Sequence, residues 1–196
     1  KAARVQRSAW PPVSYVPMSK ITLTALKQHL RQRSHEELIG DIADLFTRLD
    51  SVQDYYALRL HGPSEDLIAA YKARITHEFF PPRGYGAARL AVAQKAVAAY
   101  KKVAPPPASL ADLMLFYVEM GVRYTTTYGD INESFYSSME TMYERAVELL
   151  TASHLCDEFA ERCRRIVADT GGVGWGFHDT LSEIYDAYFA PDRPTA

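Results

Sequence analysis

Few side chains of this sequence could support catalysis or metal binding, and their spacing fits no familiar site. Cys156 and Cys163 are seven residues apart. On one helix this spacing separates them by two turns, or about 10 Å, which is too far for them to share a zinc ion. His77-Glu78 begins like a zinc-protease signature, but Pro81 stands where the second histidine should be. We therefore predict no metal site and no cofactor.

Motifs for nucleophilic catalysis and phosphate binding are also missing. The sequence contains no Gly-x-Ser-x-Gly elbow and no Gly-x-x-x-x-Gly-Lys loop, and its six histidines show no mutual spacing that suggests a cluster. An enzyme would need a site assembled from distant positions. A concave pocket that joins four polar side chains would support one: Arg89, Glu119, Tyr124 and His178. Whether the protein is an enzyme stays open, and the missing motifs argue against it.

Arg89 is the residue best suited to an anion-binding role. It falls within the apolar arc of an alanine-rich segment predicted to be helical, so its guanidinium must reach solvent, a carboxylate or a bound anion. Glu119 or Asp112, on the helix predicted next, would be its partners in an ion pair. The alternative is an anion site that Arg89 forms with Arg83 and the free backbone amides near residues 84–86.

A glycine-rich stretch, residues 171–179, is the least ordinary string of the sequence: Gly-Gly-Val-Gly-Trp-Gly-Phe-His-Asp. Its backbone amides could be directed toward an anion, and Trp175 could serve as a stacking platform or an interface anchor. In the alternative interpretation, Trp175 and Phe177 fill the core while Asp179 caps the last helix. The candidate anion- or ligand-binding residues are Arg83, Arg89, Lys95, Trp175 and His178.

The charges are unevenly distributed, although the net charge is only −2. Residues 1–35 contain seven basic and no acidic side chains, and residues 79–111 contain five basic and no acidic ones. Residues 112–196 contain six basic and fifteen acidic side chains. Such asymmetry can mark a surface for nucleic acid or phosphate. The basic residues of the middle segment do not share one helix face, however, so the favoured interpretation is a solvated surface.

The elements that must position these residues are predicted to be helices. Between the prolines, the apolar residues recur at helical spacing and no segment alternates like a strand. Ser34 and Glu37 have the spacing of a capping box, which predicts the start of a helix. The helix expected near residues 110–128 is apolar on nearly all sides and must be surrounded by other helices, with Gly121 at a point of close contact. Its narrow polar seam consists of Asp112, Glu119, Arg123 and Thr126. We predict an all-α fold: a compact, single-domain bundle of seven or eight helices around this central buried helix.

The length of 196 residues fits one ordinary domain, which we place at residues 18–189. Residues 1–17 are expected to be a cloning remnant or an upstream extension, and residues 190–196 a C-terminal tail. The apolar run at residues 113–118 is six residues long, whereas a membrane span needs roughly 20, so we predict no membrane association. Two cysteines cannot form a disulfide framework, which favours a reducing compartment.

Four stretches of the chain resemble a family of small, all-helical bacterial proteins classed as a domain of unknown function, over residues 18–189. They are His77-Glu-Phe-Phe-Pro81 with Arg89-Leu-Ala-Val-Ala93, Ala111-Asp-Leu-Met-Leu115 with Val118-Glu119, Tyr128-Gly-Asp-Ile-Asn-Glu133 with Phe135-Tyr136, and Gly174-Trp-Gly-Phe-His-Asp179 with Ile184-Tyr185. The resemblance implies a bacterial, cytoplasmic protein of unassigned role. No catalytic motif is assigned to that family, so the resemblance transfers no functional residue.

Two classes of function follow from these observations. The favoured one is a non-enzymatic protein-interaction module that binds through an aromatic surface, with a second copy of the chain or another protein as its partner, because thirteen tyrosines exceed what such a core needs and interfaces favour tyrosine. The alternative is a protein that binds nucleic acid or a phosphorylated ligand with the basic segment at residues 83–102. Nucleic acid is the less favoured partner.

Overall fold

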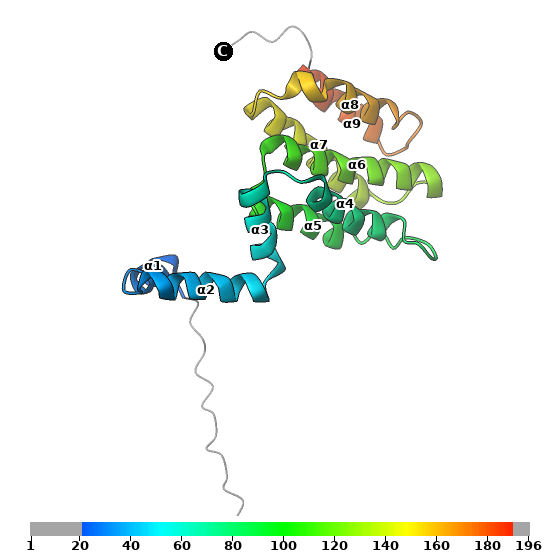
Figure 1. Cartoon of the computed structure of the whole chain (residues 1–196). Helices are drawn as coiled ribbons and strands as arrows, with labels where there is room; N and C mark the ends of the chain where they lie inside the picture. The colour runs from blue at the N-terminus through cyan, green and yellow to red at the C-terminus, as the bar shows by residue number, and fades with distance from the viewer. Residues whose placement is uncertain (1–20, 190–196) are drawn as a thin grey trace, which may run out of the picture. The chain divides into compact units, whose positions relative to one another are not determined.

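The computed structural model describes residues 21–189 (Figure 1). The predicted N-terminal extension at residues 1–17 and the tail at residues 190–196 lie outside the described residues. The chain divides into two compact units, residues 1–45 and residues 46–196, and each is described by itself. The expected extent of a single domain, residues 18–189, stays a prediction.

Nine α-helices and no strand occur among residues 21–189, which confirms the all-α fold. The helices are α1 (Leu23–Leu30), α2 (His35–Arg48), α3 (Asp50–His61), α4 (Glu65–Phe79), α5 (Leu90–Lys102), α6 (Pro107–Tyr128), α7 (Glu133–Ala152), α8 (Cys156–Ala168) and α9 (Phe177–Phe189). The predicted number of seven or eight helices was too low. Leu49 alone, in an extended conformation with φ −127° and ψ 111°, separates α2 from α3.

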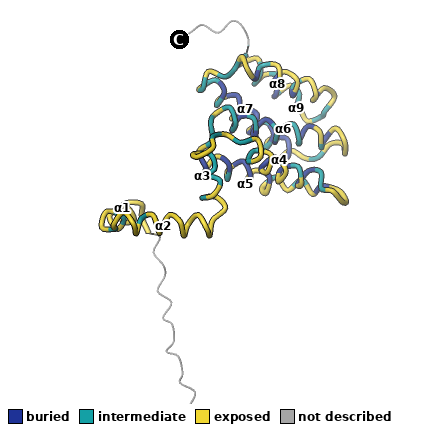
Figure 2. Tube along the Cα trace, in the orientation of Figure 1, coloured by how far each residue is buried: buried dark blue, intermediate teal, exposed yellow. Residues whose placement is uncertain are grey.

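The hydrophobic core belongs to the larger unit. Every buried residue of the described chain lies between Tyr71 and Leu181, and the dark-blue segments of Figure 2 show this concentration in α4 to α9. Helix α6 packs against α4, α5, α7 and α8 and has ten buried residues. It starts earlier than expected because Pro107, which has no N–H to leave unpaired, occupies its first turn.

The expectation that this helix is buried on nearly all sides needs a correction. Along its polar seam, Asp112 and Glu119 are only half-buried, and Arg123 and Thr126 are exposed. Carboxylate and guanidinium groups keep contact with water or with opposite charges, because burying them alone would cost several kcal/mol. The helix is therefore central but open along one narrow strip.

The close helix contact predicted at Gly121 is confirmed. A Cβ atom at this position would lie 2.1 Å from the sulfur of Met139, which is fully buried on α7. Because glycine has no side chain there, α6 and α7 approach more closely than alanine would allow.

In the N-terminal unit, hydrogen bonds between neighbouring residues define where α1 and α2 begin. The hydroxyl of Thr22 accepts a hydrogen bond from Ala25 N at the start of α1. The predicted capping box at the start of α2 is present, because Ser34 N donates to Glu37 Oε2 at 2.8 Å while Glu37 N donates to Ser34 Oγ at 3.2 Å. These hydrogen bonds from Ser34 lower the pKa of Glu37. No residue of α1 or α2 is buried, however.

Candidate functional site

One end of the larger unit carries a continuous series of aromatic rings, which we call the aromatic ladder. It lies where the loops before α5, before α7 and before α9 meet, at the right-hand side of Figure 1. Successive ring centroids are between 4.8 and 6.5 Å apart, within the range of attractive ring contacts. In order, the rings belong to Tyr85, Tyr128, Tyr124, Phe135, Tyr136 and Trp175.

The two ends of the ladder are exposed and its middle is buried. Tyr85 is 87% exposed, Tyr128 42% and Trp175 62%, whereas Phe135 and Tyr136 belong to the core. Large aromatic side chains normally bury most of their surface, so three exposed rings at one end of a domain stand out. Tyr85 contacts the ring of Tyr128, Tyr128 contacts Tyr124, and Trp175 contacts the buried ring of Tyr136.

Local sequence signals build the middle of the ladder. Tyr124 and Tyr128 are four residues apart on α6 and therefore share a face. Gly129, with φ +87°, ends that helix, and Asn132 caps α7 by accepting a hydrogen bond from Phe135 N. The rings of Tyr124 and Phe135 are thereby brought to 5.9 Å.

The hydroxyl of Tyr136 is held by three neighbours, one of which is Ile131, whose N–H donates to it at 3.4 Å. The hydroxyl donates to Asp130 Oδ1 at 3.1 Å and shares a 2.8 Å hydrogen bond with Thr125 Oγ1. Because its polar atom is satisfied, the ring can stay in the core while one face supports Trp175 at an interplanar angle of 29°.

The loop that presents Tyr85 is fastened to α4. A Cβ at Gly86 would lie 1.8 Å from the carbonyl oxygen of Phe79, so only glycine fits this close approach. Gly86 O accepts a hydrogen bond from Tyr124 Oη at 2.8 Å. Arg89 donates to both oxygens of Glu78, from Nε at 2.7 Å and from Nη2 at 3.0 Å. These hydrogen bonds and the charge of Glu78 raise the pKa of Arg89.

The predicted ion-pair partners of Arg89 were therefore wrong, since it pairs with Glu78 and not with Glu119 or Asp112. The reason is that α5 begins at Leu90, and not near residue 86, so Arg89 precedes the helix and turns back toward α4. The anion-binding role of Arg89 stays a prediction. Arg83, in the same loop, is exposed.

The predictions for the glycine-rich stretch, residues 171–179, are confirmed for Phe177 and wrong for Asp179. Phe177 fills the core as the second interpretation predicted, but Trp175 does not, because its ring lies on the surface against Tyr136. Trp175 also has φ +67°, a left-handed conformation that costs a non-glycine residue on the order of 1 kcal/mol. Helix α9 begins at Phe177, so Asp179 lies in its first turn and not at its cap.

The remaining predicted site residues lie on either side of this region. His178 is half-buried, and its Nδ1 lies 2.9 Å from Thr170 Oγ1 and 3.2 Å from Val167 O, so it fastens the loop that presents Trp175. Lys95 is exposed on α5 and lines a cavity of about 540 Å³ between α4 and α5. The ladder thus links the loop of Arg83 and Arg89 to the loop of Trp175, which His178 at the start of α9 fastens, and Lys95 lies outside it.

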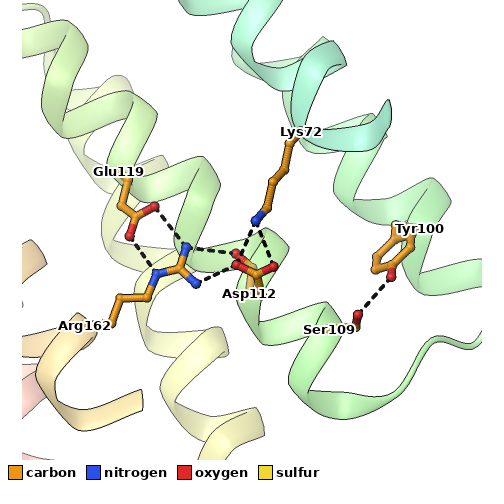
Figure 3. Close-up of polar contacts among 6 residues, drawn as sticks. All are labelled: Lys72, Tyr100, Ser109, Asp112, Glu119 and Arg162. Atoms are coloured by element: carbon orange, nitrogen blue, oxygen red, sulfur yellow. Dashed lines mark hydrogen bonds and ion pairs between the residues drawn. The ribbon is translucent and has the colours of Figure 1, made fainter. Parts of the chain in front are cut away.

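A second polar arrangement joins α4, α6 and α8 along the seam (Figure 3). Arg162 donates from Nε and Nη2 to the two oxygens of Glu119, at 2.7 and 2.9 Å, and from Nη1 to Asp112 Oδ1 at 2.6 Å. Lys72 Nζ completes the cluster at 2.9 Å from Asp112 Oδ2. Burial alone would lower the pKa of Arg162, but Glu119 and then Asp112 outweigh it and raise that pKa.

This Arg162 cluster, Lys72 with Asp112, Glu119 and Arg162, links α4, α6 and α8. It contains two cations and two carboxylates, and the hydrogen bonds among them engage both carboxylates. Arg162 was not among the residues predicted from the sequence, although its spacing from the apolar residues of α8 pointed to it. Arg162 lies three residues after Phe159 and four before Ile166, on the side of α8 that faces the core.

An enzymatic pocket would have joined four side chains, but each of them has a different hydrogen-bond partner. Arg89 pairs with Glu78, Glu119 with Arg162, Tyr124 with Gly86 and His178 with Thr170. Across residues 21–189, no group of three or more His, Cys, Asp or Glu side chains could hold a metal ion. In the same part of the chain, no helix is long and apolar enough to cross a membrane.

Comparisons with known proteins add one finding. No curated protein and no solved structure matches the chain. A family model does match, over residues 18–189, and it is described as a family of unknown function. This range is the one over which the resemblance was predicted. Because the match spans most of the 196 residues, the chain belongs to the family of unknown function DUF6155.

Proposed function

We propose that this protein is an interaction module that binds another protein with the exposed end rings of the aromatic ladder. The observation that carries the proposal is that Tyr85, Tyr128 and Trp175 are exposed and yet each contacts at least one other ring of the ladder. Residues that dominate protein interfaces are typically tyrosine, tryptophan and arginine held in place before binding.

The ring contacts within the ladder favour tight binding, because they restrict the exposed rings before a partner covers them. A side chain that is already fixed loses little conformational entropy when a partner covers it, and tyrosine and tryptophan have only two side-chain torsions to fix. Trp175 also keeps a left-handed backbone although glycines adjoin it on both sides. Strain of this kind is concentrated at functional sites, where the surrounding structure maintains it.

Charges around the ladder favour a protein partner over a polyanion. The guanidinium of Arg123 lies 4.6 Å from the ring centre of Phe80, and Asp130 adjoins the loop of Trp175, 3.0 Å from the Cβ position of Gly174. Cations and carboxylates thus occur together there, as on the polar rim of a protein interface. The alternative function, binding of nucleic acid or a phosphorylated ligand, has weaker support, because Glu78 engages the Arg89 guanidinium.

Site-specific photo-crosslinking tests the proposal. A photoreactive phenylalanine analogue at position 85 should form a discrete adduct with a cellular protein, because this side chain lies at the outer end of the ladder. The matched control position is Leu60 on α3, which is also apolar and 72% exposed but lies outside the ladder. No adduct of the same mass should form from position 60, and Trp175→Ala should abolish the adduct from position 85.

The partner identified in this way is then purified and titrated. Fluorescence of a Trp10→Phe variant reports on Trp175 alone, since the chain has two tryptophans. Binding should shift the emission to shorter wavelength, and Tyr128→Ala should weaken the affinity at least about tenfold. Equal adducts from positions 85 and 60 would contradict the proposal, as would retention on heparin that depends on salt and on Arg83, which would favour the polyanion alternative.

A further inference from the structure

The N-terminal unit exposes apolar side chains on both of its helices. On α2, Ile39, Ile42 and Leu45 lie along one arc of the helix and form what we call the α2 stripe. On α1, Leu23 and Leu26 share an arc in the same way. These five side chains are between 43% and 65% exposed. The unit has no buried residue of its own between residues 21 and 45 (Figure 2).

Such helices need a surface to pack on. Helix α1 has 8 residues and α2 has 14, and isolated helices of this length are marginal in water. Their sequences nevertheless favour helix strongly, with a capped start on α1 and a complete capping box on α2. Well-formed short helices with unburied apolar arcs are typical of elements that a partner covers.

The charges of this unit identify the partner. Residues 21–34 contain three basic and no acidic side chains, whereas residues 35–47 contain four acidic and no basic ones. One half of the segment is therefore cationic and the other half anionic. Within one chain, Arg33 pairs with Glu37 and Asp41 at 3.1 Å each, so the contact with a second copy depends on Lys27, Arg31 and Glu36. A second copy related by a two-fold axis offers the complementary pattern, because its anionic half meets the cationic half of the first copy.

We propose that the protein forms a two-fold homodimer in which α1 of each copy packs on the α2 stripe of the other. Leu23 and Leu26 then cover Ile39, Ile42 and Leu45 of the partner, and the same contact occurs twice. Lys27 and Arg31 lie opposite the acidic residues at the start of the partner's α2. This inference is independent of the aromatic ladder and goes beyond the proposed function.

The first test measures the mass of the full chain in solution by light scattering during size-exclusion chromatography. The wild type is expected to have the mass of two chains. Ile39→Asp combined with Ile42→Asp should give the mass of one chain, since charges would face the partner's leucines. Leu60→Asp, a matched substitution of an exposed apolar residue outside α1 and α2, should remain dimeric.

A charge-exchange experiment tests the pairing itself. Lys27→Glu with Arg31→Glu makes both halves anionic, and Glu36→Lys with Asp44→Lys makes the second half more cationic. Each variant alone should be monomeric, because like charges meet in both contacts of the dimer. An equimolar mixture of the two should be dimeric, because opposite charges then meet in both contacts.

Circular dichroism and the melting temperature check that each variant folds, and these variants leave the aromatic ladder intact. A monomeric wild type would overturn the inference. A mixture that stays monomeric while the wild type is dimeric would overturn the proposed pairing. Neither outcome affects the crosslink expected from position 85, so the two proposals fail separately.

Discussion

At the scale of single residues, Arg162 shows how a charged side chain can hold three helices together. Its guanidinium is 27% exposed and binds the carboxylates of Asp112 and Glu119 on α6, while Lys72 on α4 binds Asp112 as well. Removing the arginine would leave two carboxylates close together with only the ammonium of Lys72 to offset them. Removing one partner of a buried charge pair lowers the free energy of unfolding by more than the intact pair contributes, because it leaves the other charge unpaired.

Arg162→Met should therefore lower the free energy of unfolding by about 2 kcal/mol at neutral pH, a value reduced from that of fully buried pairs because water reaches the cluster. Urea titration followed by circular dichroism measures this loss. The matched control is Arg164→Met, since Arg164 pairs with Glu161 on the exposed side of the same helix, where water screens the pair, and its loss should lower the free energy of unfolding much less. Equal losses in the two variants would show that the cluster contributes no more than a surface pair.

At the scale of elements, the spacing of apolar residues predicts where helices form. It does not predict which helices the loops between them contact. The helical spacing, the capping box at Ser34 and the close contact at Gly121 were read correctly from neighbouring residues. The start of α5 was not, because the close approach of Gly86 to Phe79 O is a contact between separate elements. The sequence likewise predicted an aromatic surface, whereas the meeting of Tyr85, Tyr128 and Trp175 at one end depends on tertiary packing.

The contact of α6 with α7 yields a prediction at this scale. Gly121→Ala should destabilise the larger unit by about 1–3 kcal/mol, because the added methyl group would overlap the sulfur of Met139 in a core without spare room. Chemical denaturation measures the loss, and Met139→Val in the same chain should recover part of it.

Gly40→Ala provides the matched control, because Gly40 is also helical but has nothing within 4 Å of its Cβ position. Alanine favours the helix over glycine by up to about 1 kcal/mol, so this substitution should raise the helix content of α2 slightly. If Gly121→Ala also proved stabilising, the two helices would have to pack less closely than the contact at Met139 indicates.

At the scale of the whole molecule, four buried tyrosines from four successive helices make the stability of the core depend on pH. Tyr71, Tyr100, Tyr117 and Tyr143 lie on α4, α5, α6 and α7 and are at most 2% exposed. Burial raises the pKa of each above the ordinary value of 10.0. Asp54, which accepts a hydrogen bond from the Tyr71 hydroxyl, raises the pKa of Tyr71 further. In the unfolded chain all four ionise near their ordinary value.

Because the folded pKa values are the higher ones, the folded protein retains these protons longer than the unfolded protein does. The stabilisation is fully present below pH 10 and is lost as the pH rises above it, by up to about 1.4 kcal/mol per pH unit for each tyrosine. The free energy of unfolding, measured with urea between pH 9 and pH 11, should therefore fall steeply above pH 10. Tyr143→Phe should make this fall shallower, although it also removes the hydrogen bond to Cys163 O and lowers stability at neutral pH. A slope that Tyr143→Phe leaves unchanged would mean that the Tyr143 hydroxyl reaches water in the folded protein.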